Sequence, residues 1–251
     1  MRTRNKTFSI IIALLPVIAV AGNPVRIMEG LSIYSKILRQ KVKYSVILPT
    51  EYFSSNKSFP VVYLLHGLGD TESSWMEYGR LSQFIDMERC AEQIIPAIYV
   101  MPQGFRSYYV NDYQGKFKYE DMFIKEFIPY IDSAYRTIPD GRHRAIIGYS
   151  MGGFGALVLP LKHPEVFSVS VPLSISVRTH SQYMTESPQE EWDRQWGRLF
   201  GNEGKSGKER ITEYYKLNSP FYLIKSKRKT CDLKIYIDNG DDEQTLAKSN
   251  E

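Results

Sequence analysis

The 251-residue sequence predicts a doubly wound α/β fold, in which helices cover both faces of a mostly parallel sheet. Three observations predict it. Short apolar runs bounded by glycine or proline recur along the chain, as in strands that are buried on both faces. Segments with helical periodicity lie between these runs. One run ends in "GYSMG" (148–152), a serine between glycines where strand gives way to helix.

The strands are expected in chain order. The segment 32–49 reads as two strands around a short polar turn. Single strands are then expected at 59–67, 97–102, 144–150, 167–174 and 233–238. With 43% hydrophobic and 24% charged residues, the composition is that of an ordinary globular protein rather than of a disordered chain.

Helices are expected between the strands. The apolar positions of 121–136 repeat at helical spacing, with Asp121 as N-cap and Pro129 as a point where the helix is expected to kink. A second helix follows Ser150 and ends at Pro164. The segment 177–219 has weak periodicity and is too long for a simple loop, so it is expected to be a partly helical insertion near the site.

The first 21 residues have the pattern of a secretory signal peptide. A basic start, a moderate apolar run and the small residues "AVA" occur in that order. The apolar run is shorter than the roughly 20 residues of a spanning helix, and Pro16 interrupts it. We therefore expect a secreted or periplasmic protein whose residues 22–251 form the α/β domain, with no membrane association after the signal is removed.

Charge and cysteine content give little sign of other partners. Loss of three basic residues with the signal leaves a nearly neutral protein, and the basic run 225–229 is expected to be a solvated loop, so no nucleic-acid partner is expected. Cys90 and Cys231 are expected to be half-buried free thiols, with a disulfide as the alternative.

Ser150 is expected to be a nucleophile on a strained strand-to-helix turn, where side chains at the flanking glycines would collide with neighbouring backbone. The "HGLGD" loop (66–70) ends an earlier strand, so its backbone can reach the same edge of the sheet. We assign the oxyanion-binding N–H groups to Leu68 and Met151. His66 is expected to stabilise its turn rather than to take part in chemistry.

These motifs resemble the esterase D / feruloyl esterase family, the carbohydrate-esterase branch of the α/β hydrolases. The matching stretches include "FPVVYLLHGLGDTESSW", "YEDMFIKEFIPYIDSAYRT", "RAIIGYSMGGFGAL" and "LKIYIDNGDDE". The resemblance implies an α/β-hydrolase fold and a serine esterase that acts on feruloyl or acetyl esters of plant polysaccharides, without a cofactor. S-formylglutathione hydrolases share that fold, but a signal peptide fits the polysaccharide branch better.

The acid of the triad is expected after a late strand, because the order along the sequence in these hydrolases is serine, acid, histidine. In the family pattern the acid falls three residues after the glycine of this loop, which gives Glu243, where aspartate is usual. Asp242 lies one residue away and remains the alternative. The spacing of these carboxylates is not that of a calcium loop, so no metal is expected.

The histidine of the triad is harder to place, because the sequence contains four histidines and none in the family position. His143 is expected about 23 Å from Ser150, at the far end of its strand. His163 is expected about 18 Å away, at the end of the following helix. His66 belongs to the oxyanion loop, and His180 alone follows a strand at the right edge.

We therefore expect the base to lie beyond Glu251, in about 30–50 further residues that would complete the fold. The sequence would then be truncated at its C-terminus, which puts the activity of the 251 residues alone in question. Two alternatives stay open: an acyltransferase with the same triad, and a non-catalytic carbohydrate-binding homologue. Trp75, Tyr108 and Tyr109 are expected in the core or at the rim of the site, with stacking on a phenolic acyl group as the alternative. The expected partner is a small-molecule or polysaccharide ester, and the sequence does not set the oligomeric state.

Overall fold

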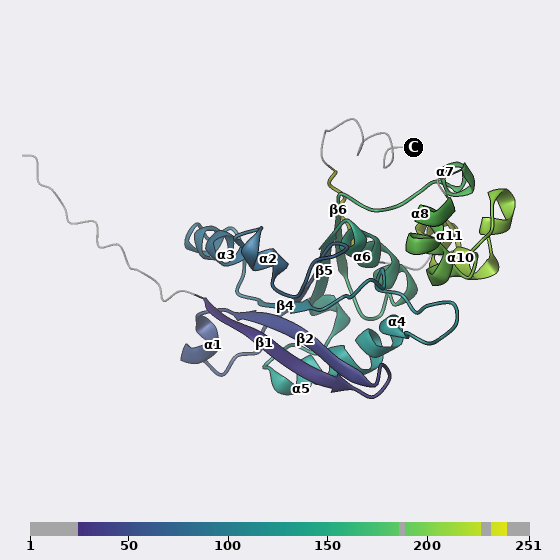
Figure 1. Cartoon of the computed structure of the whole chain (residues 1–251). Coiled ribbons are helices and arrows are strands. Elements are labelled where there is room, and N and C mark those ends of the chain that lie inside the picture. The colour runs from purple at the N-terminus through teal and green to yellow at the C-terminus, as the bar shows by residue number, and fades with distance from the viewer. Residues whose placement is uncertain (1–24, 186–188, 227–231, 240–251) are drawn as a thin grey trace, which may run out of the picture.

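A computed structural model describes residues 25–185, 189–226 and 232–239 (Figure 1). Its centre is a seven-stranded sheet in the order β1-β2-β4-β3-β5-β6-β7. The strands are β1 (Arg26–Ser35), β2 (Gln40–Leu48), β3 (Val61–Leu65), β4 (Ile98–Pro102), β5 (Arg144–Tyr149), β6 (Val169–Leu173) and β7 (Lys234–Ile235). The predicted α/β fold with a mostly parallel sheet is confirmed.

The direction of the strands divides the sheet into two parts. β1 and β2 form an antiparallel hairpin, and β2 pairs antiparallel with β4. From β4 through β3, β5 and β6 to β7 all neighbours are parallel. The carboxyl ends of these parallel strands therefore meet at one edge, where ligands bind in open α/β sheets.

β7 is shorter than the sequence predicts. Only Lys234–Ile235 form a strand, and one further bridge joins Leu173 to Asp238. Tyr236 and Ile237 are exposed, each at 59%. Within the described residues β7 is an edge strand, and its side chains are exposed rather than covered on both faces as its composition suggested.

Helices cover both faces of the sheet. They are α1 (Glu51–Ser54), α2 (Ser74–Glu77), α3 (Leu81–Cys90), α4 (Tyr119–Met122), η1 (Phe123–Phe127), α5 (Ile128–Ala134), η2 (Gly141–His143), α6 (Met151–Lys162), α7 (His180–Thr185), α8 (Gln189–Trp192), η3 (Asp193–Gly197), α9 (Arg198–Phe200), η4 (Gly207–Arg210), α10 (Glu213–Asn218) and α11 (Pro220–Ser226). α3 buries Ile85 against Leu64 on one face. Tyr63, its neighbour on the strand, points to the other face and packs with Phe123 and Leu157.

The helix expected at 121–136 differs in two details. It begins at Tyr119, so Asp121 is not the N-cap; its N–H instead donates to Asn111 Oδ1 at 3.1 Å. The expected irregularity near Pro129 is present as the π-helical turn η1 directly before it. Proline has no N–H for a regular helix, and its ring would collide with the carbonyl one turn earlier.

The insertion at 177–219 is partly helical, as predicted. Its short helices α7 to α10 gather with α11 on one side of the molecule (Figure 1). Trp192 and Trp196 are fully buried there, and aromatic rings make up much of the packing in this part of the protein.

The structure tests only some of the remaining predictions from the sequence. Cys90 is a free thiol, but it is exposed rather than half-buried. Cys231 and the expected signal peptide lie outside the described residues. In the part of the chain that the structure describes, no helix combines the length and the apolar character needed to cross a membrane.

Candidate active site

Ser150 occupies the turn between β5 and α6 in a backbone conformation that side chains rarely adopt. Its φ is 55° and its ψ is −116°, outside the allowed regions for a non-glycine residue. Its N–H donates to the carbonyl of Leu173 at 3.0 Å, and its carbonyl accepts from Phe154 at 3.0 Å and Ser176 at 3.2 Å. These bonds to β6 and α6 hold the strained turn in place, and the strain predicted for Ser150 is present.

Two glycines make this turn possible. A Cβ atom on Gly152 would lie 2.2 Å from the carbonyl oxygen of Leu65, at the end of β3. A Cβ atom on Gly148 would lie 2.2 Å from the carbonyl oxygen of Gly152. Both obstacles are backbone atoms that cannot rotate away. The first turn of α6 therefore lies directly against the end of β3, which brings the loop after β3 to Ser150.

The N–H groups of Leu68 and Met151 are available for a ligand. Met151 is the first residue of α6, and Leu68 lies in the loop that follows β3. Among the described residues, neither N–H donates a hydrogen bond. The N-terminus of a helix also carries a partial positive charge. The arrangement can stabilise negative charge on an oxygen bound beside Ser150.

His66 is fixed in one neutral form. Its Nδ1 donates to the carbonyl of Gly67 at 2.8 Å, and its Nε2 accepts the N–H of Gly104 at 2.7 Å. Tyr109 Oη donates to the carbonyl of His66 at 3.0 Å. Burial lowers the pKa of His66, because the charged form loses its hydration. Both ring nitrogens are occupied, so the prediction of a structural role for His66 is confirmed.

The other three histidines are not positioned beside Ser150. His143 belongs to η2, before β5, and the Nε2 of His163 pairs with Glu120 Oε1 at 2.8 Å beyond the end of α6. His180, the only one of the four whose predicted position could reach the site, stacks on Tyr222 with 4.6 Å between ring centroids. Within the described residues no hydrogen bond links Ser150 to any histidine.

The candidate acids Asp242 and Glu243 lie outside the described residues, but the strand leading to them is placed. Asp238 pairs with Leu173, and its carbonyl accepts the N–H of Ser174 at 2.8 Å. Leu173 is also the residue whose carbonyl holds Ser150. Because β6 lies between β5 and β7, one strand separates the strand that ends before Ser150 from the strand that leads to the predicted acid loop.

The structure shows a second contact, between the serine turn and the loop after β3, that the sequence analysis did not predict. Tyr149 Oη donates to Asp70 Oδ2 at 2.7 Å, and the Trp75 ring packs edge-on to Tyr149 at 5.2 Å. Burial, with this hydrogen bond, raises the pKa of Tyr149. The residue before the serine thus anchors the loop that carries Leu68.

Tyr108 and Tyr109 are buried, as expected of core residues, and do not lie at the mouth of the site.

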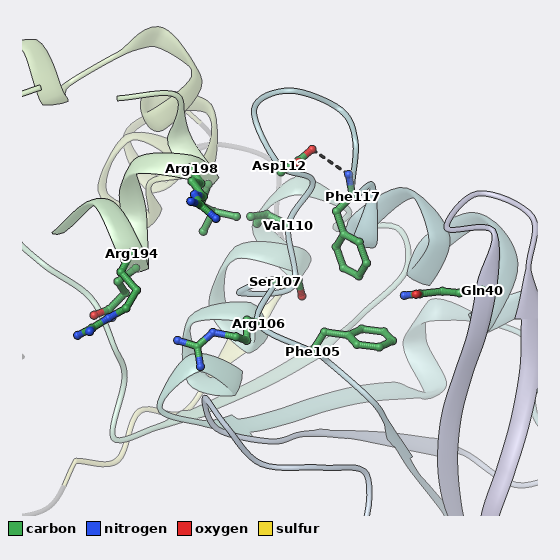
Figure 2. A pocket seen from close by; sticks show the side chains of 11 residues that line it. Gln40, Phe105, Arg106, Ser107, Val110, Asp112, Phe117, Arg194 and Arg198 are labelled. Atoms are coloured by element: carbon green, nitrogen blue, oxygen red, sulfur yellow. Dashed lines mark hydrogen bonds between the residues drawn. The ribbon is translucent and has the colours of Figure 1, made fainter. Parts of the chain in front are cut away.

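A cavity of about 590 Å³ lies between the loop after β4 and the η3–α9 segment (Figure 2). Three arginines and two phenylalanines are among its eleven lining residues. The lining residues are Gln40, Phe105, Arg106, Ser107, Val110, Asp112, Phe117, Arg194, Gln195, Arg198 and Leu199. The sequence analysis missed this cavity, because its arginines come from segments far apart in the sequence and carry no motif.

No metal site is evident in the described part of the chain, since no three histidine, cysteine, aspartate or glutamate side chains gather there. The chemistry that the geometry offers is that of the serine turn. A half-buried serine lies at the carboxyl edge of the parallel strands, and among the described residues the N–H groups of Met151, which follows it, and of Leu68, in the loop after β3, donate no hydrogen bond.

Comparison with known proteins gives the family. The model described as "Putative esterase" matches residues 35–251. The chain belongs to this esterase family. An endo-1,4-beta-xylanase/feruloyl esterase of Xylanibacter ruminicola is 37% identical over 43% of this chain, and an acetyl esterase of Caldicellulosiruptor saccharolyticus is 26% identical over 60% of it. The matches span only 15% and 56% of those relatives' lengths.

A solved ferulic acid esterase structure is similar over most of the protein. The TM-score is 0.65 at 25% identity, covering 86% of this chain and 91% of that one. The resemblance to the feruloyl esterase family that the sequence motifs indicated is therefore confirmed, and the chain has the fold of the α/β hydrolases.

Proposed function

We propose that this member of the esterase family acts as an exported serine esterase on feruloyl or acetyl esters of plant polysaccharides. The observation that carries the proposal is the conformation of Ser150. A non-glycine residue at φ 55° and ψ −116° is costly, and such strain is kept where function requires it. The strained turn lies at the carboxyl edge of the parallel strands, where the N–H groups of Leu68 and Met151 are proposed to bind the oxyanion.

The proposed reaction has two halves. A base removes the proton from Ser150 Oγ, which attacks the ester carbonyl carbon while the N–H groups of Leu68 and Met151 hold the oxyanion. The carbon–oxygen bond to the sugar breaks, and the sugar oxygen takes the proton from the base. Water, activated by the same base, then attacks the acyl-serine and releases the acid. Asp242 or Glu243 would orient the base and stabilise its charged form.

The proposed base is a histidine that is not among the four in this sequence. His66 has both nitrogens engaged, His163 pairs with Glu120, His143 lies at the opposite edge, and His180 stacks on Tyr222. The acyl groups are proposed from the names of the relatives, a feruloyl esterase and an acetyl esterase. Export is proposed from the signal-like pattern of residues 1–21.

Hydrolysis of p-nitrophenyl acetate and methyl ferulate, beside the Ser150→Ala variant, tests the proposal. Turnover by the 251-residue protein that disappears in the variant supports the serine mechanism. It would also show that a base exists within the 251 residues, which would contradict the proposal that the base is a histidine outside this sequence. If the folded protein is inactive, extending it with the downstream coding sequence should restore turnover. Failure of the extended protein would overturn the proposed function.

A further inference from the structure

The arginine-lined cavity is linked to the serine turn through the buried Tyr108. Tyr108 Oη accepts a hydrogen bond from the side chain of Gln195, and its ring packs edge-on to Phe154 with 5.7 Å between ring centroids. Gln195 lines the cavity, and the N–H of Phe154 donates to the carbonyl of Ser150 at 3.0 Å. A molecule held in the cavity is therefore only a few side chains away from the proposed nucleophile.

The charge of the cavity walls is strongly positive. Arg106 comes from the loop after β4, while Arg194 and Arg198 lie four residues apart and so share one helical face. The only acidic residue among those that line the cavity is Asp112, and its Oδ1 already accepts the N–H of Phe117 at 3.0 Å. Arg198 also approaches Glu203 at 3.5 Å, but both side chains are largely exposed, so the pair is weak and easily displaced.

The opposite wall is apolar and aromatic. Phe105 and Phe117 are half-buried, and their rings pack edge-to-face with 5.4 Å between centroids. In Figure 2 they face the cavity from the side opposite Arg194 and Arg198. A flat ring with an apolar face and an anionic substituent would meet both walls. The cavity volume of about 590 Å³ is that of a small-molecule site.

The chemistry of an ester decides which part of the substrate could carry the charge. The carboxyl group of the acid is consumed in the ester bond, and a feruloyl or acetyl group keeps no other strong acid. A phenol has a pKa near 10 and stays neutral at ordinary pH. An anion recognised beside the reacting ester must therefore belong to the alcohol, which is the sugar.

We propose that this cavity binds an anionic sugar next to the esterified one and so directs the enzyme to acyl esters on acidic polysaccharides. The guanidinium groups of Arg106 and Arg198 would pair with a uronate carboxylate or a sugar sulfate, since their planar fork matches such oxyanions. The sugar ring would pack on Phe105 and Phe117. This inference rests on the proposed esterase function for its meaning, although the binding itself does not require turnover.

Binding is tested without catalysis, on the protein with the Ser150→Ala substitution. Three xylo-oligosaccharides of equal length are titrated by calorimetry: neutral, glucuronic-acid-substituted and sulfated. We expect at least one anionic form to bind at least about tenfold more tightly than the neutral form, with an advantage that shrinks as salt is raised. The tighter of the two anionic sugars identifies whether the natural charge is carboxylate or sulfate.

Variants locate the binding. The double variant Arg106→Gln/Arg198→Gln is expected to reduce the preference for the anionic sugar at least tenfold, and Arg142→Gln is the control. Arg142 is 82% exposed and lies before β5, at the opposite edge of the sheet. Equal affinity for neutral and anionic sugars overturns the inference. So does a preference that Arg142→Gln reduces as much as the paired cavity variant.

Hydrolysis of feruloylated forms of the same sugars by the active protein separates the two proposals. If neither ester is hydrolysed while the anionic sugar still binds through the arginines, the esterase function fails and the binding site stands. If neutral and anionic esters are hydrolysed with equal kcat/KM, and the arginine variants change neither, the function stands and the binding site is wrong.

Discussion

The Nε2 atom of His66 accepts the backbone N–H of Gly104 across 2.7 Å, and this contact joins the loop after β3 to the loop after β4. The first loop carries the N–H of Leu68, and the second forms a wall of the arginine-lined cavity. Because the imidazole must be neutral to accept this bond, the link between the proposed oxyanion site and the cavity depends on pH.

Acid is expected to weaken the fold through His66. Its pKa is lowered in the folded protein by burial, so below the ordinary pKa of about 6.5 the unfolded protein binds the proton more readily. Stability from this group is present above that pH and is lost as the pH falls toward the lowered value. We expect the free energy of unfolding, measured in urea, to fall between pH 8 and pH 5 by more in wild type than in His66→Gln.

His180 is the necessary control, because burial lowers its pKa as well. The His180→Gln variant should retain the part of the pH dependence that His66 causes. An identical fall in wild type and His66→Gln would contradict the account of a neutral, accepting His66. At pH 8, His66→Ala should unfold about 1–3 kcal/mol more easily, because the buried N–H of Gly104 loses its acceptor.

Substitutions of Ser150 are expected to affect activity and stability differently. Ser150→Ala and Ser150→Gly should each reduce kcat at least about 10³-fold in the active protein, because the nucleophile is gone. Glycine adopts φ 55° without strain, so Ser150→Gly should be about 1 kcal/mol more stable than Ser150→Ala. Urea unfolding of the pair measures this difference. Equal stability would mean that the strain at the turn is not significant.

Gly152→Ala is expected to destabilise the fold strongly. Its Cβ would lie 2.2 Å from the carbonyl oxygen of Leu65, so β3 or α6 must shift, at a cost of about 3 kcal/mol or more. Gly69→Ala is the control. Its φ is 92°, but no atom lies within 4 Å of the added Cβ, so only the backbone strain of about 1 kcal/mol is expected. Similar losses in the two variants would contradict the close approach of α6 to β3.

The hydrogen bond from Tyr149 to Asp70 is expected to position the loop of Leu68. Tyr149→Phe and Asp70→Asn should show a coupling energy of about 1 kcal/mol in a double-mutant cycle of unfolding. In the active protein Tyr149→Phe should lower kcat several-fold and leave KM nearly unchanged, since the oxyanion contact matters mainly in the transition state. A change in KM alone would place Tyr149 in substrate binding instead.

Local signals in the sequence were sufficient for the sheet and for the serine turn. The apolar runs at 59–67 and 144–150 predicted β3 and β5, because strands covered on both faces need such runs. The glycines around Ser150 predicted its strained turn, since only glycine fits against the backbone there. α3 was not predicted, and of its residues only Ile85 is fully buried.

Contacts between distant segments could not be predicted in the same way. Asp70 and Tyr149 meet only because β3 and β5 are neighbours in the sheet. The cavity needs Arg106 and Arg194 on facing segments, which no local pattern encodes. The expectation that His180 could reach the site relied on its strand alone and did not account for the aromatic side chains that hold its ring.

The most direct test of the account is to treat the folded protein with a fluorophosphonate, which phosphonylates activated serine hydroxyls, and to measure the intact mass and the labelled peptide. The account predicts one adduct per molecule on Ser150, in the 251-residue protein or in its C-terminally extended form, and none in Ser150→Ala. An adduct on another residue, or an extended and folded protein that forms no adduct, would contradict the assignment of Ser150 as the nucleophile.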